Sequence, residues 1–84
     1  MASLDDRIDE KFLYDHPNIR VTFFDKGIFT YRGVMDKEYV QLLMMRGIAQ
    51  KSIDYIQKHL KRKGFEGIKG YDIMSERHKN TLGR

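Results

Sequence analysis

The sequence contains no cysteine and a single proline. Without cysteine the chain has no disulfide framework and no cysteine-based zinc site. This absence fits a reducing compartment, and we predict a cytoplasmic protein. No run of about 18 apolar residues is present, so the sequence predicts no membrane-spanning helix. The N-terminal segment is acidic and amphipathic and lacks the basic and apolar regions of a secretory signal.

The chain has 84 residues, which predicts a single domain. Hydrophobic residues make up 40% and charged residues 33%, which is typical of a globular rather than a disordered chain. A chain of this size is marginally stable unless it is well packed or oligomeric. We expect residues 1–74 to form one small domain and residues 75–84 to form a mobile basic C-terminal tail.

The two halves of the chain differ in charge. Residues 1–45 hold six basic and eight acidic side chains, for a net charge of −2, whereas residues 46–84 hold ten basic and four acidic ones, for +6. This asymmetry indicates that the C-terminal half contacts an anion, either nucleic acid or the acidic surface of a protein. A basic surface that serves only solubility is the alternative.

Residues 18–34 have the pattern of a β-hairpin. Apolar side chains alternate along residues 19–24, as in a half-buried strand. Residues 25–27, Asp-Lys-Gly, can form the turn, and Phe29 and Tyr31 then share one side of the returning strand. We therefore predict an α+β fold, in which a small antiparallel sheet packs with two or three α-helices.

Three segments have helical patterns. The first helix is expected over about residues 4–14 and ends before Pro17, because proline disfavours helical geometry in the preceding residue. A second helix is expected directly after Asp36, which is a good N-cap. The third is expected over residues 49–63, with Gly64 at its C-terminal end.

Residues 21–34 follow the pattern V-x-F-x-x-x-G-x-F-x-Y-x-G-V. Together with apolar and aromatic positions as far as residue 61, this order resembles the KTSC domain. That small module is named after a C-terminal extension of some lysyl-tRNA synthetases, and it also occurs in stand-alone bacterial and phage proteins. Met35 stands where the family prefers proline, and the family's Ser-x-Gly segment is not preserved. The resemblance implies a hairpin with packed helices and implies no particular chemistry.

The sequence offers no catalytic set. The histidines, His16, His59 and His78, lie in separate segments, and no serine stands in a nucleophile-elbow motif. No pair of carboxylates suggests an acid and a base, and no histidine spacing suggests a metal site. We therefore expect a protein without enzymatic activity and without a cofactor.

A basic cluster in the second half is the strongest functional signal. The candidate nucleic-acid or anion-binding residues are Arg46, Lys51, Lys58, Lys61, Arg62, Lys63 and Lys69. Such cations release counterions from phosphates, which gives affinity independent of sequence. An exposed Tyr55 could add base stacking. Cations near a helix C-terminus also stabilise the helix itself, so a plain solvated surface is the alternative.

A glycine pair follows the basic helix. Gly64-Phe65-Glu66-Gly67 matches the GxxG loop with which KH domains clamp a nucleic-acid backbone. Glu66 within the loop would repel phosphate, so the preferred interpretation is a helix C-cap followed by a turn.

The candidate protein-interface residues are Phe24, Tyr31, Met44, Met45 and Tyr55. In a strand, neighbouring Phe23 and Phe24 face opposite sides, so one of them needs a cover. The edge of the hairpin could also pair with a partner or with a second copy in a homo-oligomer. We expect a small protein that acts through protein–protein interaction, such as a phage-encoded accessory of a host machine. RNA or DNA binding by the helix around residues 51–63 is the alternative.

Overall fold

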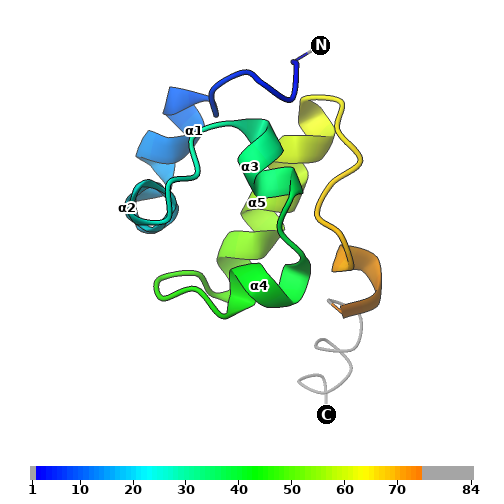
Figure 1. The fold of residues 1–84 in the computed structure, drawn as a ribbon. Coiled ribbons are helices and arrows are strands. Elements are labelled where there is room, and N and C mark those ends of the chain that lie inside the picture. Colours follow the sequence, from blue (N-terminus) through cyan, green and yellow to red (C-terminus); the bar gives the residue numbers. More distant parts are fainter. Residues whose placement is uncertain (1, 75–84) are drawn as a thin grey trace.

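The computed structural model describes residues 2–74, which form helices joined by turns (Figure 1). The helices are α1 (Glu10–Asp15), α2 (Pro17–Asp25), α3 (Tyr31–Met35), α4 (Tyr39–Leu43) and α5 (Gln50–Arg62). A further helical turn covers residues 71–74. No helix in this part of the chain has the length and apolar character needed to cross a membrane. The predicted tail, residues 75–84, lies outside the described residues.

The predicted α+β fold is wrong, because the segment expected to form the hairpin is helical. Helix α2 replaces the first expected strand, and α3 begins within the second. Between residues 2 and 74, β-type pairing is limited to two isolated bridges, Arg7 with Thr30 and Glu38 with Lys69. The hairpin with packed helices that the KTSC resemblance implies is therefore wrong as well. Residues 2–74 therefore offer no hairpin edge for the expected homo-oligomer, and homo-oligomerisation itself stays a prediction.

Helix α2 forms where a strand was expected for two physical reasons. Pro17 ends α1 as predicted, but it also stands at the first position of α2, where its fixed φ suits a helix and its missing N–H is not needed. Ile19, Thr22 and Phe23 are buried at the i, i+3 and i+4 spacing of one helix face. The β-branched residues favour a strand locally, but burial of this face decides the conformation.

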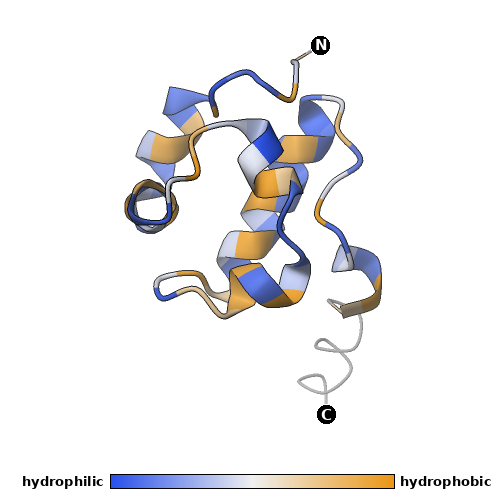
Figure 2. Cartoon of the chain, viewed as in Figure 1, coloured by the Kyte–Doolittle hydropathy of each residue, from blue (hydrophilic) through white to orange (hydrophobic). Residues whose placement is uncertain are grey.

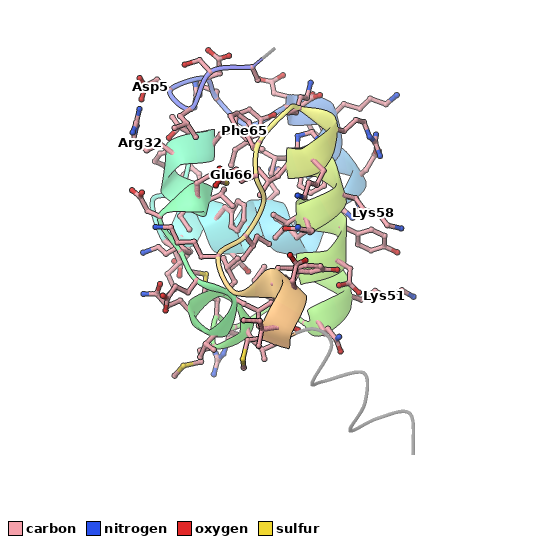
Figure 3. The ribbon with its side chains drawn as sticks, turned by 90° about the vertical axis from the view of Figure 1, so that its right-hand side faces the viewer. Asp5, Arg32, Lys51, Lys58, Phe65 and Glu66 are labelled. Carbon is pink, nitrogen blue, oxygen red and sulfur yellow. The ribbon has the colours of Figure 1, made fainter. Side chains whose placement is uncertain are left out.

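The N-terminal helix is shorter than predicted. It begins after Asp9, whose carboxylate accepts a hydrogen bond of 3.0 Å from the Lys11 N–H and so caps α1. The preceding residues run alongside the connection from α2 to α3, and the Arg32 N–H donates to the Leu4 carbonyl at 2.7 Å. An exposed ion pair of 2.8 Å between Arg32 and Asp5 lies at the same place (Figure 3).

The second predicted helix also begins later than expected. Helix α4 has Glu38 rather than Asp36 as its N-cap, in a capping box that Gln41 completes. Helix α5 agrees with the predicted range 49–63 to within one residue at each end. The strong amphipathic pattern of α5 explains this agreement, because one face is apolar and the other is charged (Figure 2).

Helix α5 runs through the middle of the molecule, with α1 and α2 on one side and residues 64–70 on the other (Figure 1). Around it lies one cluster of buried apolar side chains, contributed by every helix except α1 and by the connections. The members are Ile8, Ile19, Phe23, Ile28, Tyr31, Val34, Tyr39, Leu42, Ile48, Ile53, Ile56, Leu60 and Ile68. Helix α1 adds Phe12 and Leu13, which pack against this cluster while remaining partly exposed.

The end of α5 is a Schellman motif. The Phe65 N–H donates to the Leu60 carbonyl at 3.0 Å, the Gly64 N–H donates to the Lys61 carbonyl at 3.1 Å, and Gly64 has a φ of +93°. The preferred interpretation of the GxxG segment as a helix C-cap is therefore confirmed. Beyond the motif the chain reverses and runs back along α5.

The returning segment is held to α5 by a buried glutamine. The Gln57 side-chain oxygen accepts a hydrogen bond of 2.7 Å from the Ile68 N–H. Gly67 has a φ of +104°, and a Cβ on it would lie 2.5 Å from the Gln57 amide nitrogen. The close approach of this segment to α5 therefore requires glycine.

Gly67→Ala should destabilise the protein more than Gly27→Ala, which serves as the matched control. Both glycines have positive φ, but a Cβ at Gly27 would meet nothing within 4 Å. The control pays only the left-handed backbone cost, about 1–2 kcal/mol. Displacing Gln57 adds the loss of a buried hydrogen bond, a further ~1–3 kcal/mol. Urea unfolding measures both changes, and equal losses in the two variants would contradict this account of Gly67.

Two tyrosines whose rings are in contact, Tyr39 at the start of α4 and Tyr71 in the helical turn at residues 71–74, differ in their hydrogen bonding. The Tyr39 hydroxyl is buried without a hydrogen-bond partner, and this burial raises its pKa. The Tyr71 hydroxyl donates to Asp54 at 2.7 Å. The two rings contact each other edge to face, with centroids 6.0 Å apart.

Removing these two hydroxyls should therefore have opposite effects on stability. Tyr39→Phe relieves the cost of burying an unpaired polar atom and should stabilise the protein by about 1 kcal/mol. Tyr71→Phe removes a hydrogen bond to a carboxylate and should destabilise it by about 1–2 kcal/mol. Thermal unfolding at neutral pH compares the two variants, and destabilisation by Tyr39→Phe would show that its hydroxyl has a partner.

Candidate binding surfaces

All the predicted basic residues except Lys63 are exposed, but they do not form one cluster. Lys51, Lys58, Lys61 and Arg62 lie on α5. Lys63 caps the helix, is half-buried and forms an ion pair of 3.4 Å with Asp9. Arg46 and Lys69 belong to two other connections, so the basic residues that share a surface are those of α5.

A groove of about 350 Å³ lies between α1 and α5. On the α5 side it is lined by Tyr55, Lys58 and Arg62, and on the α1 side by Phe12 and His16. We call it the α1–α5 groove. It combines rings with cations, which is the combination expected of a site for an aromatic anion.

A series of packed rings leads from this groove into the core. Neighbouring ring centroids are between 4.3 and 5.7 Å apart. In order of contact from the groove, the rings are those of Tyr55, His16, Phe12, His59, Tyr31 and Phe65. His59 and Tyr31 are the most buried of them. Rings from α1, α3 and α5 thus fix the wall of the groove.

The most buried pair of rings in this series, Tyr31 and His59, also forms a polar contact. The Tyr31 hydroxyl lies 2.9 Å from His59 Nε2 and accepts a hydrogen bond of 3.1 Å from the Asp9 N–H. Because the Tyr31 hydroxyl oxygen already accepts from the Asp9 N–H, the hydroxyl can donate its own hydrogen to His59 Nε2 when that nitrogen carries no proton. Burial lowers the pKa of His59, and the Lys63 cation adds to this effect.

Protonation of His59 should therefore destabilise the fold. Its pKa in the folded chain lies below the ordinary value of 6.5, so the stability is complete above about pH 6.5 and is lost as the pH falls through the folded pKa. The pKa values of Asp5 and Asp9 are lowered below 3.8, so these groups titrate outside this window. The free energy of unfolding should fall between about pH 7 and pH 5.

The control is His59→Phe, which keeps a ring against Phe12 but cannot titrate. At neutral pH its free energy of unfolding should be lower than that of the wild type, because the Tyr31 hydroxyl loses its acceptor. Between about pH 7 and pH 5 it should stay nearly constant, because phenylalanine does not titrate. Urea unfolding at several pH values measures both. A wild-type protein as insensitive to pH as the variant would contradict a neutral, hydrogen-bonded His59.

A second surface consists of exposed aromatic side chains. Tyr14, Phe24 and Phe29 are exposed by 71%, 73% and 45%. They line a groove of about 270 Å³ between α1 and α2, and we call them the aromatic patch. Phe24 and Phe29 meet edge to face at 5.9 Å, and the Arg20 guanidinium lies 5.6 Å from the centre of the Tyr14 ring.

The predicted interface residues lie on different parts of the surface. Phe24 belongs to the aromatic patch, Met44 at the end of α4 is 81% exposed, and Tyr55 lines the α1–α5 groove. Met45 is partly buried against the core. Tyr31 is only 2% exposed because its ring completes the buried series, so its prediction as an interface residue is corrected.

Sequence reasoning missed two members of the aromatic patch and the role of His16. The sequence suggested no role for His16, yet its ring packs between Phe12 and Tyr55. The spacing of Phe12 and His16, i and i+4, was the available signal for one shared helix face. Leu4, Ile8 and Phe12 follow an i, i+4, i+8 spacing, and Tyr14 lies off that stripe, so its position could have marked it as exposed.

No group of three side chains suited to binding a metal ion is found among residues 2–74. No family model, curated protein or solved structure matches the chain. The resemblance to the KTSC domain therefore stays a prediction. Functional inference depends on the two surfaces described above.

Proposed function

We propose that this chain is a non-enzymatic module that binds a protein partner through the aromatic patch. The observation that carries the proposal is the exposure of three aromatic side chains, Tyr14, Phe24 and Phe29, around one groove. Large exposed apolar patches on small proteins mark interaction sites, and aromatic residues are enriched in the cores of interfaces. The absence of cysteine leads us to place this interaction in the cytoplasm.

The composition of α2 supports the proposal. Its inner face buries Ile19 and Phe23, but its outer face also carries apolar side chains, Val21 and Phe24, which are exposed. A helix that packs on a core normally carries polar or charged residues on its outer face. Phe24 lines the groove between α1 and α2, so a partner seated there would cover it and would account for its presence. Val21 borders the separate groove beside α2.

The groove favours an amphipathic helix with acidic flanks as the partner segment. Its floor is formed by core residues such as Ile28 and Phe23, and its volume suits one or two large apolar side chains of an incoming helix. Arg7 and Arg20 also line it, opposed by Glu10 alone, so its net charge is positive. Acidic residues beside the apolar anchors would complement these cations.

Selection from a random peptide display library tests the proposal. Peptides that bind the full chain should carry two large apolar residues three or four positions apart, with Asp or Glu beside them. Phe24→Ser should weaken their binding at least about tenfold, because a central aromatic contact is commonly worth 2 kcal/mol or more. Fluorescence anisotropy of labelled peptides measures the affinity.

Met44→Ser is the matched control, since it removes an equally exposed apolar side chain outside the aromatic patch. It should leave peptide binding unchanged. Both variants should keep the free energy of unfolding within about 0.5 kcal/mol of wild type, because both side chains are exposed. Selected peptides that bind Phe24→Ser as tightly as wild type would overturn the proposal.

A further inference from the structure

We infer that the α1–α5 groove binds single-stranded nucleic acid, with a base stacked on Tyr55 and phosphates held by the cations of α5. This site is separate from the aromatic patch, and the inference does not depend on the protein-binding proposal. Helix α1 divides the two surfaces: Leu13 and Tyr14 face the groove with α2, whereas Phe12 and His16 face the groove with α5. Both surfaces are therefore available on one molecule.

The exposed face of α5 carries a regular stripe of cations. Lys51, Lys58 and Arg62 share it with Tyr55, at positions i, i+7, i+11 and i+4. Lys51 and Lys58 project from the same side of the helix, away from the body of the molecule (Figure 3). At a rise of 1.5 Å per residue the stripe is about 16 Å long, enough to follow several phosphates of an extended strand.

The carboxylate of α5 does not interrupt this stripe. Asp54 lies next to Tyr55 in sequence, but it accepts a hydrogen bond of 2.7 Å from the Tyr71 hydroxyl on another side of the helix. Asp9, on the opposite wall of the groove, is paired with Lys63 at 3.4 Å. The stripe thus presents positive charge that is not neutralised from within α5.

Tyr55 is the platform on which a base would stack. Its side chain is 39% exposed, so one part of the ring is open to solvent. The ring packs on His16 at 4.5 Å, and His16 packs on Phe12 at 4.7 Å. This support limits the motion of Tyr55, so a stacked base costs little ordering of the protein.

The remaining acidic residue of the groove favours a nucleotide over a simple anion. Asp15 lines the groove opposite the cations of α5. It would repel inorganic phosphate, but a carboxylate can accept hydrogen bonds from the amino group of a base. The combination of a ring, cations and one acceptor therefore fits a base with its phosphate. Stacking requires an unpaired base, which favours a single strand over a duplex.

Fluorescence anisotropy with a labelled single strand of about 12 nucleotides tests the inference on the full chain. Binding at low salt should weaken as salt is added, with a log–log slope of about −2 for three neutralised phosphates. Tyr55→Ala should weaken binding about tenfold and Tyr55→Phe should not, because phenylalanine keeps the stacking ring. The double variant Lys58→Glu, Arg62→Glu should weaken it at least as much as Tyr55→Ala.

The control is Lys26→Glu with Arg46→Glu, which changes the net charge equally but acts at a third groove, beside α2. It should leave binding within about threefold of wild type if the effect is local. Circular dichroism and thermal unfolding should show that all variants fold. Four outcomes would overturn the inference: no binding at low salt, equal loss in the two double variants, an unchanged Tyr55→Ala variant, or equally tight binding of a duplex or a polyglutamate peptide.

Discussion

The buried contact between the Tyr31 hydroxyl and His59 Nε2 joins residues 28 positions apart in the sequence. Because the Asp9 N–H donates to the same hydroxyl, the beginning of α1, the beginning of α3 and the end of α5 meet at one oxygen atom. Buried polar groups must keep their partners, so this contact allows little variation in how the three helices pack. The Phe65 ring, next to Tyr31, also ties the returning C-terminal segment to this point.

Helix α1 is tied to this contact through the Asp9 N–H at its beginning. It has six residues, Glu10–Asp15, which is too short to be stable by itself. Its position comes from the Asp9 cap and from the packing of Phe12 on the buried His59. Since α1 forms one wall of each groove, any movement of α1 changes both grooves together. The polar contact in the core therefore contributes to the shape of both candidate binding surfaces, together with the packing of α1 on α2.

The parts of the molecule that could be predicted from sequence are those with a strong local pattern. The ends of α5 and the exposed stripe that includes Lys51 and Lys58 follow directly from helical spacing. The groove beside that stripe could not be predicted, because its other wall comes from α1. The aromatic patch has the same origin, since Tyr14 and Phe29 come from separate segments and lie together only through the packing of α1 against α2.

The failure to predict α2 has a physical cause that bears on function. A helix that only packs on a core needs one apolar stripe, and Ile19 with Phe23 supplies it. Val21, between Ile19 and Phe23, completed the alternation that favoured a strand, and Phe24 added an apolar residue outside the helical stripe. Local sequence preferences that conflict with the fold are expected at functional sites. The residues that made the helix hard to recognise thus lie on its exposed surface, and the protein partner that we propose would account for the exposure of Phe24.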